Sequence, residues 1–112
     1  MTQTEKIEMA LEGQYGIARA QFLKDYHKEY LIQLLETKKL ADHMIDTENR
    51  AWDLKAEYEN LPPGGAGEII QETLIAPTGD GEEVTYTLPE MKHLRELWRE
   101  NFPEYELDDF LN

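Results

Sequence analysis

The chain is 112 residues long and has a formal net charge of −13 at pH 7, from 24 acidic and 11 basic residues. This length fits one domain, and a hydrophobic content of 40% is too high for a wholly disordered chain. The lack of cysteine excludes disulfides and thiolate catalysis and argues against the usual structural zinc site. No apolar run approaches the roughly eighteen residues of a membrane span, and the first residues lack a signal-peptide pattern, so we expect a cytoplasmic protein.

The first quarter of the sequence has an apolar stripe at helical spacing. Its members recur every three or four positions: Ile7, Leu11, Tyr15, Ala18, Phe22 and Tyr26. Gly13 and Gly16 interrupt the stripe, and each costs about 1 kcal/mol relative to alanine inside a helix. We therefore expect a break or a close backbone contact at these glycines, with the main helix beginning near Tyr15.

Two further helices are predicted before residue 62. The first is short and contains Tyr30, Leu31, Leu34 and Leu35, with a joint at residues 37–38. The second has a heptad-like seam made of Leu40, Met44, Thr47, Ala51, Leu54, Tyr58 and Leu61. Because Thr47 and Ala51 would pack poorly in a coiled coil, an antiparallel hairpin within the chain is favoured over a coiled-coil dimer. Homodimerisation stays open.

A β-hairpin is predicted over residues 68–88. Residues 62–67 contain two prolines and three glycines and are typical of a connector. Residues 68–76 and 83–88 flank a glycine-rich turn at 77–81, and Val84, Tyr86 and Leu88 alternate with threonines as in a half-buried strand. An isolated hairpin is marginally stable in water, so one face must rest on the helices and the other would expose the acidic residues.

The last predicted helix spans residues 89–101. The sequence from Thr87 to Glu90 has the spacing of a capping box with a proline in the first turn, and Leu94, Leu97 and Trp98 form the buried face. This helix should end before Pro103, leaving residues 102–112 as an acidic tail that either closes the core or inserts into a partner. The predicted fold class is α+β and mainly helical: antiparallel helices, a small β-hairpin and a C-terminal helix in one domain.

The negative charge is concentrated in two zones. The middle zone lies between Lys55 and Lys92 and contains eight acidic residues and no Lys or Arg. The second zone follows Arg99 and contains five more acidic residues, again without Lys or Arg. The rest of the chain is formally neutral. Such a charge repels nucleic-acid phosphate and attracts cationic surfaces. The alternative interpretation is that an acidic surface only keeps the protein soluble.

Part of the first half resembles a known family. The motif comprises Gly13-Gln-Tyr-Gly16, Arg19, Leu23-Lys24, Leu34-Leu35, Lys39-Leu40 and His43. Over residues 13–51 this pattern is similar to that of the TnpV family of small transposon-encoded proteins. The resemblance implies a helical protein of a mobile element, from a gut-type bacterium or its phage, without an established chemistry. The chain departs from the family by having a single arginine, Arg19, where the family has an arginine cluster, and by its different C-terminal half. A changed partner is the simplest interpretation.

The sequence offers little support for catalysis. His27, His43 and His93 show no metal-binding spacing; His43 with Asp42 and Asp46 could form a weak site, but a packed or capping histidine is favoured. The turn at 77–81 lacks the Gly-Lys-Ser/Thr of a phosphate loop, and no nucleophile–base arrangement is visible, so a small hydrolase is the least supported class and no cofactor is expected. Trp52 is expected in the core more than at an interface.

We therefore predict a binding protein that presents carboxylates in place of nucleic-acid phosphates. It would inhibit a host nucleic-acid-targeting nuclease of the CRISPR or restriction type by occupying its Lys/Arg-lined groove, without binding nucleic acid or membranes itself. Tyr105 and Phe110 would anchor the partner. The predicted partner-binding residues are Glu68, Glu72, Asp80, Glu82, Glu83, Glu104, Tyr105, Glu106, Asp108, Asp109 and Phe110. The alternative is a non-inhibitory accessory protein of a transposon or conjugative element that bridges proteins through the Leu40–Leu61 seam.

Overall fold

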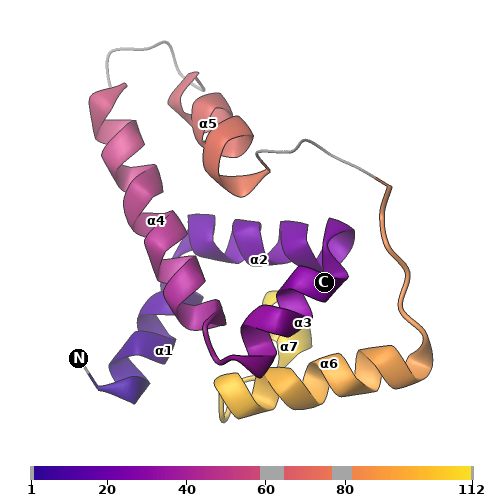
Figure 1. The fold of residues 1–112 in the computed structure, drawn as a ribbon. Helices are drawn as coiled ribbons and strands as arrows, with labels where there is room; N and C mark the ends of the chain where they lie inside the picture. Colours follow the sequence, from indigo (N-terminus) through magenta and orange to yellow (C-terminus); the bar gives the residue numbers. More distant parts are fainter. Residues whose placement is uncertain (1, 59–64, 77–81, 112) are drawn as a thin grey trace.

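The structure is a computed structural model that describes residues 2–58, 65–76 and 82–111 (Figure 1). All of the regular secondary structure in these residues is helical. The helices are α1 (Gln3–Glu12), α2 (Gln14–Tyr26), α3 (Lys28–Glu36), α4 (Leu40–Glu57), α5 (Gly65–Ile70), the π-helix η1 (Gln71–Ile75), α6 (Leu88–Asn101) and α7 (Leu107–Phe110).

The predicted β-hairpin is wrong, because no strand forms in the described part of the chain and the fold is helical rather than α+β. The first strand was expected at residues 68–76, but residues 68–75 belong to α5 and η1. In η1 the amide of Ala76 donates to the carbonyl of Gln71, so the wider turn brings residues five apart onto one face. Ile70 and Ile75 are both buried as a result. The predicted turn at 77–81 lies outside the described residues.

The predicted second strand is extended but has no strand partner. Residues 82–87, here called the extended segment, run along one edge of the molecule to the start of α6 (Figure 1). The amide of Val84 donates to the carbonyl of Asp25 at 2.7 Å, so the segment is attached to the end of a helix. The alternation of Val84, Tyr86 and Leu88 does not mark a strand: Val84 and Tyr86 are partly buried, but Leu88 is 89% exposed and begins α6.

The local predictions for the helices are confirmed. The chain breaks at Gly13 between α1 and α2, and the short third helix and the long fourth helix form where expected. Thr87 and Glu90 make both hydrogen bonds of the capping box at the start of α6. This helix ends at Asn101, two residues before Pro103. Leu61, at the end of the predicted seam, lies outside the described residues.

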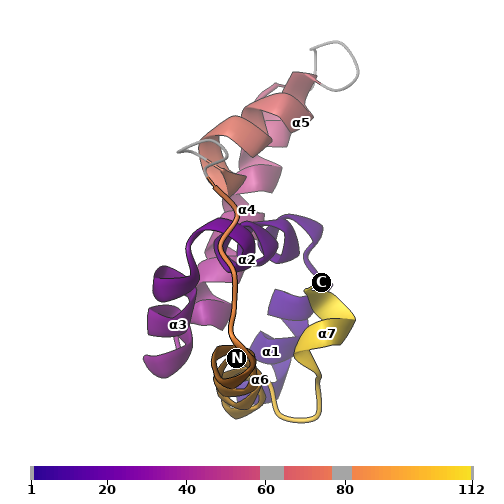
Figure 2. The ribbon, with the colours of Figure 1, turned by 90° about the vertical axis from the view of Figure 1, so that its right-hand side faces the viewer.

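The molecule consists of a body and a projecting arm (Figures 1 and 2). In the body, α2 crosses α4, α1 packs against both, and α6 packs against α3. The second half of α4 extends away from these helices together with the adjacent α5 and η1, and these three elements form the arm (Figure 2). The acidic tail does not protrude: Leu107 and Leu111 are buried, so the tail closes the chain's own core.

Gly16 sets the distance between α2 and α4. A Cβ atom at this position would lie 2.7 Å from the carbonyl oxygen of Met44 and 3.1 Å from its Cβ. The two backbones therefore meet directly, which is the close contact that the sequence predicted. The seam of α4 is buried at this crossing, with Leu40, Met44 and Ala51 fully inaccessible to solvent.

Substituting Gly16 should destabilise the protein. A methyl group in Gly16→Ala must displace the α4 backbone, and the cost of overpacking exceeds the gain in helix propensity by about 1–2 kcal/mol. Gly67→Ala in α5 is the matched control, because nothing lies within 4 Å of its Cβ position, and it should stabilise by about 0.5–1 kcal/mol. Urea unfolding measures both; equal effects of the two variants would contradict the crossing.

Candidate partner-binding surface

Glu48 of α4 caps the start of α2. The N-cap residue of α2 is Gly13, which has no side chain to accept hydrogen bonds from the first amides of the helix. Glu48 Oε1 accepts from the amides of Tyr15 at 2.7 Å and Gly16 at 3.2 Å, so a carboxylate 33 residues away along the chain supplies the missing cap. The negative charge also lies at the positive end of the helix dipole.

The capping role of Glu48 was not predicted, although its position in the sequence of α4 indicates one. Glu48 follows Met44 by four residues and precedes Ala51 by three, which places a carboxylate on the apolar face of α4. A carboxylate on a buried face needs a hydrogen-bond donor, and the first amides of the helix that begins after Gly13 have no acceptor in their own cap residue.

Trp52 is 48% exposed, so the prediction that it lies in the core is wrong. Its indole N–H donates to Glu48 Oε2, and its ring makes an edge contact with Tyr15 at 5.9 Å. The ammonium of Lys55 lies 4.6 Å from the centre of the ring. Trp52 is therefore held in place while one part of the indole faces solvent.

Arg19 of α2 and His43 of α4 are hydrogen-bonded to each other. Arg19 Nε donates to His43 Nε2 at 3.1 Å, and Arg19 Nη1 donates to the carbonyl of Ile75 at 2.8 Å. The ring of Tyr30 makes an edge contact with His43 at 5.8 Å. This junction connects α2, α3, α4 and η1, so a half-buried arginine fixes the arm to the body.

His43 has the structural role that the sequence favoured over metal binding. Burial, reinforced by the charge of Arg19, lowers the pKa of His43, which favours the neutral imidazole that accepts the hydrogen bond. Asp42 pairs with Lys6 and Asp46 with Arg50. Across residues 2–58, 65–76 and 82–111, no three His, Asp or Glu side chains are grouped so as to hold a metal ion.

The extended segment is fastened to the junction of α2 and α3 by side chains as well as backbone. Lys28 Nζ donates to the carbonyl of Thr85 at 2.9 Å, and the hydroxyl of Tyr86 donates to the carbonyl of Lys24 at 2.6 Å. Burial, together with the charges of Asp25 and Glu90, raises the pKa of Tyr86 to about 12. The phenol therefore remains a hydrogen-bond donor across the neutral range.

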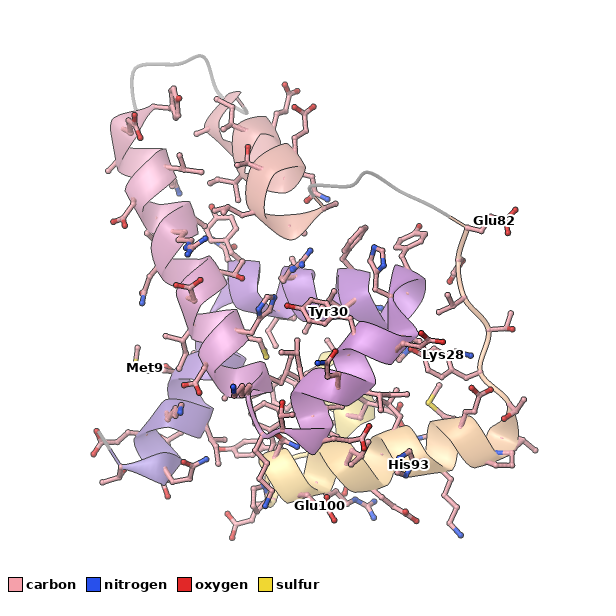
Figure 3. The ribbon with its side chains drawn as sticks, in the orientation of Figure 1. Met9, Lys28, Tyr30, Glu82, His93 and Glu100 are labelled. Atoms are coloured by element: carbon pink, nitrogen blue, oxygen red, sulfur yellow. The ribbon has the colours of Figure 1, made fainter. Side chains whose placement is uncertain are left out.

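The predicted acidic residues of the middle zone are exposed but are not brought into one cluster. Glu68 lies on α5 and Glu72 on η1, in the arm. Glu82 and Glu83 are exposed on the extended segment, with Glu82 on the opposite side of the molecule from α4 (Figure 3). Asp80 lies outside the described residues.

Two acidic residues of the tail are paired with arginines of the same molecule. Glu106 contacts Arg99 at 2.9 Å and Asp108 contacts Arg95 at 3.2 Å. Glu104 and Asp109 are exposed. The tail therefore differs from the middle zone because two of its carboxylates are neutralised by arginines of the same molecule.

The predicted aromatic anchors of the tail pack against their own chain. The ring of Phe110 lies 6.1 Å from that of Trp98 in α6, and Tyr105 makes an edge contact with Phe110 at 5.8 Å. Both side chains are only partly buried. Their role as partner anchors stays a prediction.

A groove that sequence analysis missed lies between the start of α3 and the extended segment. Its volume is about 460 Å³. Its walls are formed by Tyr26, His27, Lys28, Glu29, Tyr30, Gln33 and Val84. Two aromatic residues and a histidine lie close together in the sequence around the α2–α3 junction and could have indicated one wall of the groove. The opposite wall could not be predicted, because it forms only when residues 82–87 pack against this junction.

Comparison with known proteins does not assign a family. No family model matches the chain, and no curated protein or solved structure matches it. The resemblance to the TnpV family therefore stays a prediction. Among the helices described, none is both long and apolar enough to cross a membrane.

Removing the carboxylate of Glu48 should loosen the start of α2. Glu48→Ala leaves the amides of Tyr15 and Gly16 without an acceptor, so we expect a loss of about 1–2 kcal/mol in urea unfolding. Asn49→Ala, at the exposed neighbouring position, should change stability by less than about 0.5 kcal/mol. If both variants unfold at the same urea concentration, the cap contributes nothing.

The capping box of α6 should make stability depend on acid pH. Hydrogen bonds from the amide of Thr87 and from Lys28 lower the pKa of Glu90 to about 2. A depressed pKa stabilises the fold above the unfolded-state value of about 4.3, and this contribution disappears as the pH falls toward 2. Unfolding measured from pH 6 to pH 2 should show wild type more stable than Glu90→Gln at the upper end, with the difference shrinking on acidification. A constant difference would contradict this role.

Proposed function

We propose that the protein is a non-catalytic binding module of a mobile genetic element, acting in the cytoplasm of a bacterial host. Its target would be a basic nucleic-acid-binding protein, and its effect would be inhibition of a CRISPR or restriction nuclease by imitation of DNA. The module itself would bind neither nucleic acid nor membrane.

The observation that carries this proposal is the uncompensated charge of the middle zone. Glu68, Glu72, Glu82 and Glu83 are exposed, and none of them forms an ion pair within the described part of the chain. The sequence from residue 56 to residue 91 also contains no Lys or Arg. Carboxylates without an intramolecular partner attract a cationic surface most strongly.

The tail contributes less to this proposal than the sequence predicted. Because Arg95 and Arg99 pair with Asp108 and Glu106, a partner would have to compete with these contacts to use the tail. We therefore assign partner recognition to the middle zone. The tail has a structural role through Leu107 and Leu111.

The adaptor function remains a second candidate, but on a different surface. Leu40, Met44 and Ala51 are buried against the chain's own helices, so this part of the seam cannot bridge proteins. The half-exposed, immobilised Trp52 favours an adaptor surface on the outer side of α4, since aromatic residues often dominate binding energy at interfaces.

Charge reversal tests the proposed function. Immobilised protein is incubated with host lysate at low and high salt, and captured nucleic-acid enzymes are identified and then tested for release by duplex DNA. Glu82→Lys with Glu83→Lys should abolish capture, because it replaces two unpaired carboxylates by cations. Glu8→Lys with Glu12→Lys makes the same charge change on exposed sites of α1 and should leave capture intact.

The opposite result would support the adaptor. In that case the partner would still be captured after the reversal at residues 82 and 83, would not be released by duplex DNA, and would no longer be captured by Trp52→Ala. This result would contradict nuclease inhibition by charge imitation. It would place recognition on α4.

A further inference from the structure

The groove beside α3 has the chemistry of a site for a cationic peptide. It offers about 460 Å³ between the α2–α3 junction and Val84, within the usual range for ligand sites. This inference rests on the proposed function, because it specifies how a cationic partner would be held.

One wall of the groove presents an aromatic surface. Tyr30 is 41% exposed, and its ring is held by the edge contact with His43 at 5.8 Å. Figure 3 shows Tyr30 at the centre of the molecule, on the helix from which Lys28 reaches toward the extended segment. An immobilised ring with an accessible surface can receive a guanidinium group at low entropic cost.

Among the described residues that line the groove, one is a lysine, Lys28, and it is already paired within the protein. Lys28 Nζ contacts Glu90 Oε2 at 2.9 Å and the carbonyl of Thr85 at 2.9 Å. Its charge is therefore compensated inside the protein, and it fastens the opposite wall in place.

Among the described residues, the other charged side chains in the groove wall and next to Val84 are acidic. Glu29 lines the groove, and Glu82 and Glu83 immediately precede Val84 in its wall. All three are exposed, and in the described residues none has a hydrogen bond or ion pair with another side chain. An occupant must therefore supply positive charge, and a phosphate-bearing ligand is disfavoured.

We propose that this groove binds a short arginine-containing segment of a partner protein. A guanidinium group would stack on Tyr30 and pair with Glu29, while a second cation would meet Glu82 and Glu83. Arginine suits this site better than lysine because its planar group both stacks on aromatic rings and pairs with carboxylates.

An NMR titration with a synthetic peptide tests the site. The probe is an uncharged-end peptide with the sequence Gly-Arg-Leu-Arg-Gly, and the control replaces each arginine by glutamate. Changes in amide chemical shift on adding the arginine peptide should be confined to residues 26–33 and 82–85. The affinity should fall as the salt concentration rises, and the glutamate peptide should not bind. Shifts centred on α4 or on the tail would overturn the proposal, as would equal binding of the two peptides.

Two variants separate binding from folding. Glu29→Gln should weaken the peptide about fivefold by removing an unpaired carboxylate, and Tyr30→Leu should weaken it about fivefold by removing the ring. Glu36→Gln, at the other end of α3, should have no effect. If Tyr30→Leu unfolds, Glu29→Gln against Glu36→Gln decides, and equal affinity of these two variants would overturn the proposal.

The groove and the wider function fail in different ways. If the peptide does not bind but capture of a nucleic-acid enzyme still depends on Glu82 and Glu83, the groove proposal is wrong and the proposed function stands. If the peptide binds as expected but capture of a nucleic-acid enzyme does not depend on Glu82 and Glu83, the groove proposal stands and the proposed nuclease inhibition is wrong.

Discussion

The close crossing of α2 over α4 is the constraint on which the rest of the structure depends. Gly16 lets the two backbones meet at Met44, and Glu48 then reaches the first amides of α2. The crossing therefore needs both a residue without a side chain on α2 and a carboxylate on α4. The crossing also brings Arg19 within reach of His43 and of the carbonyl of Ile75. The arm, the junction of α2 with α3 and the groove beside it all take their positions from this contact.

The fold divides the acidic residues into two groups with different consequences. In the tail, α6 supplies Arg95 and Arg99 to Asp108 and Glu106, and α7 packs its apolar side against the core. The middle zone itself contains no Lys or Arg, and among its described acidic residues the one with an ion pair is Glu90, which contacts Lys28 of α3. Exposed ion pairs contribute little to stability, so the pairs of the tail matter here chiefly because they reduce its attraction for a partner.

Local signals in the sequence predicted local structure well. Gly13 and Gly16 indicated the helix break and the close contact, and Thr87 with Glu90 indicated the start of α6, because each depends on residues a few positions apart. The hairpin prediction failed because nine residues with paired isoleucines fit a strand or a helix equally well, and packing against α4 decides between them. The compensation of the tail was beyond the sequence: Arg95 and Asp108 are thirteen residues apart and meet only because the chain reverses after α6.

Amide hydrogen exchange at Tyr15 and Gly16 tests the central crossing most directly. Amides in the first turn of a helix have no acceptor within the helix and ordinarily exchange fast. If Glu48 caps α2 across the crossing, both amides should exchange as slowly as those of the buried middle of α2, and Glu48→Ala should release them selectively. Fast exchange of both amides in the wild-type protein would show that the two helices do not meet as described.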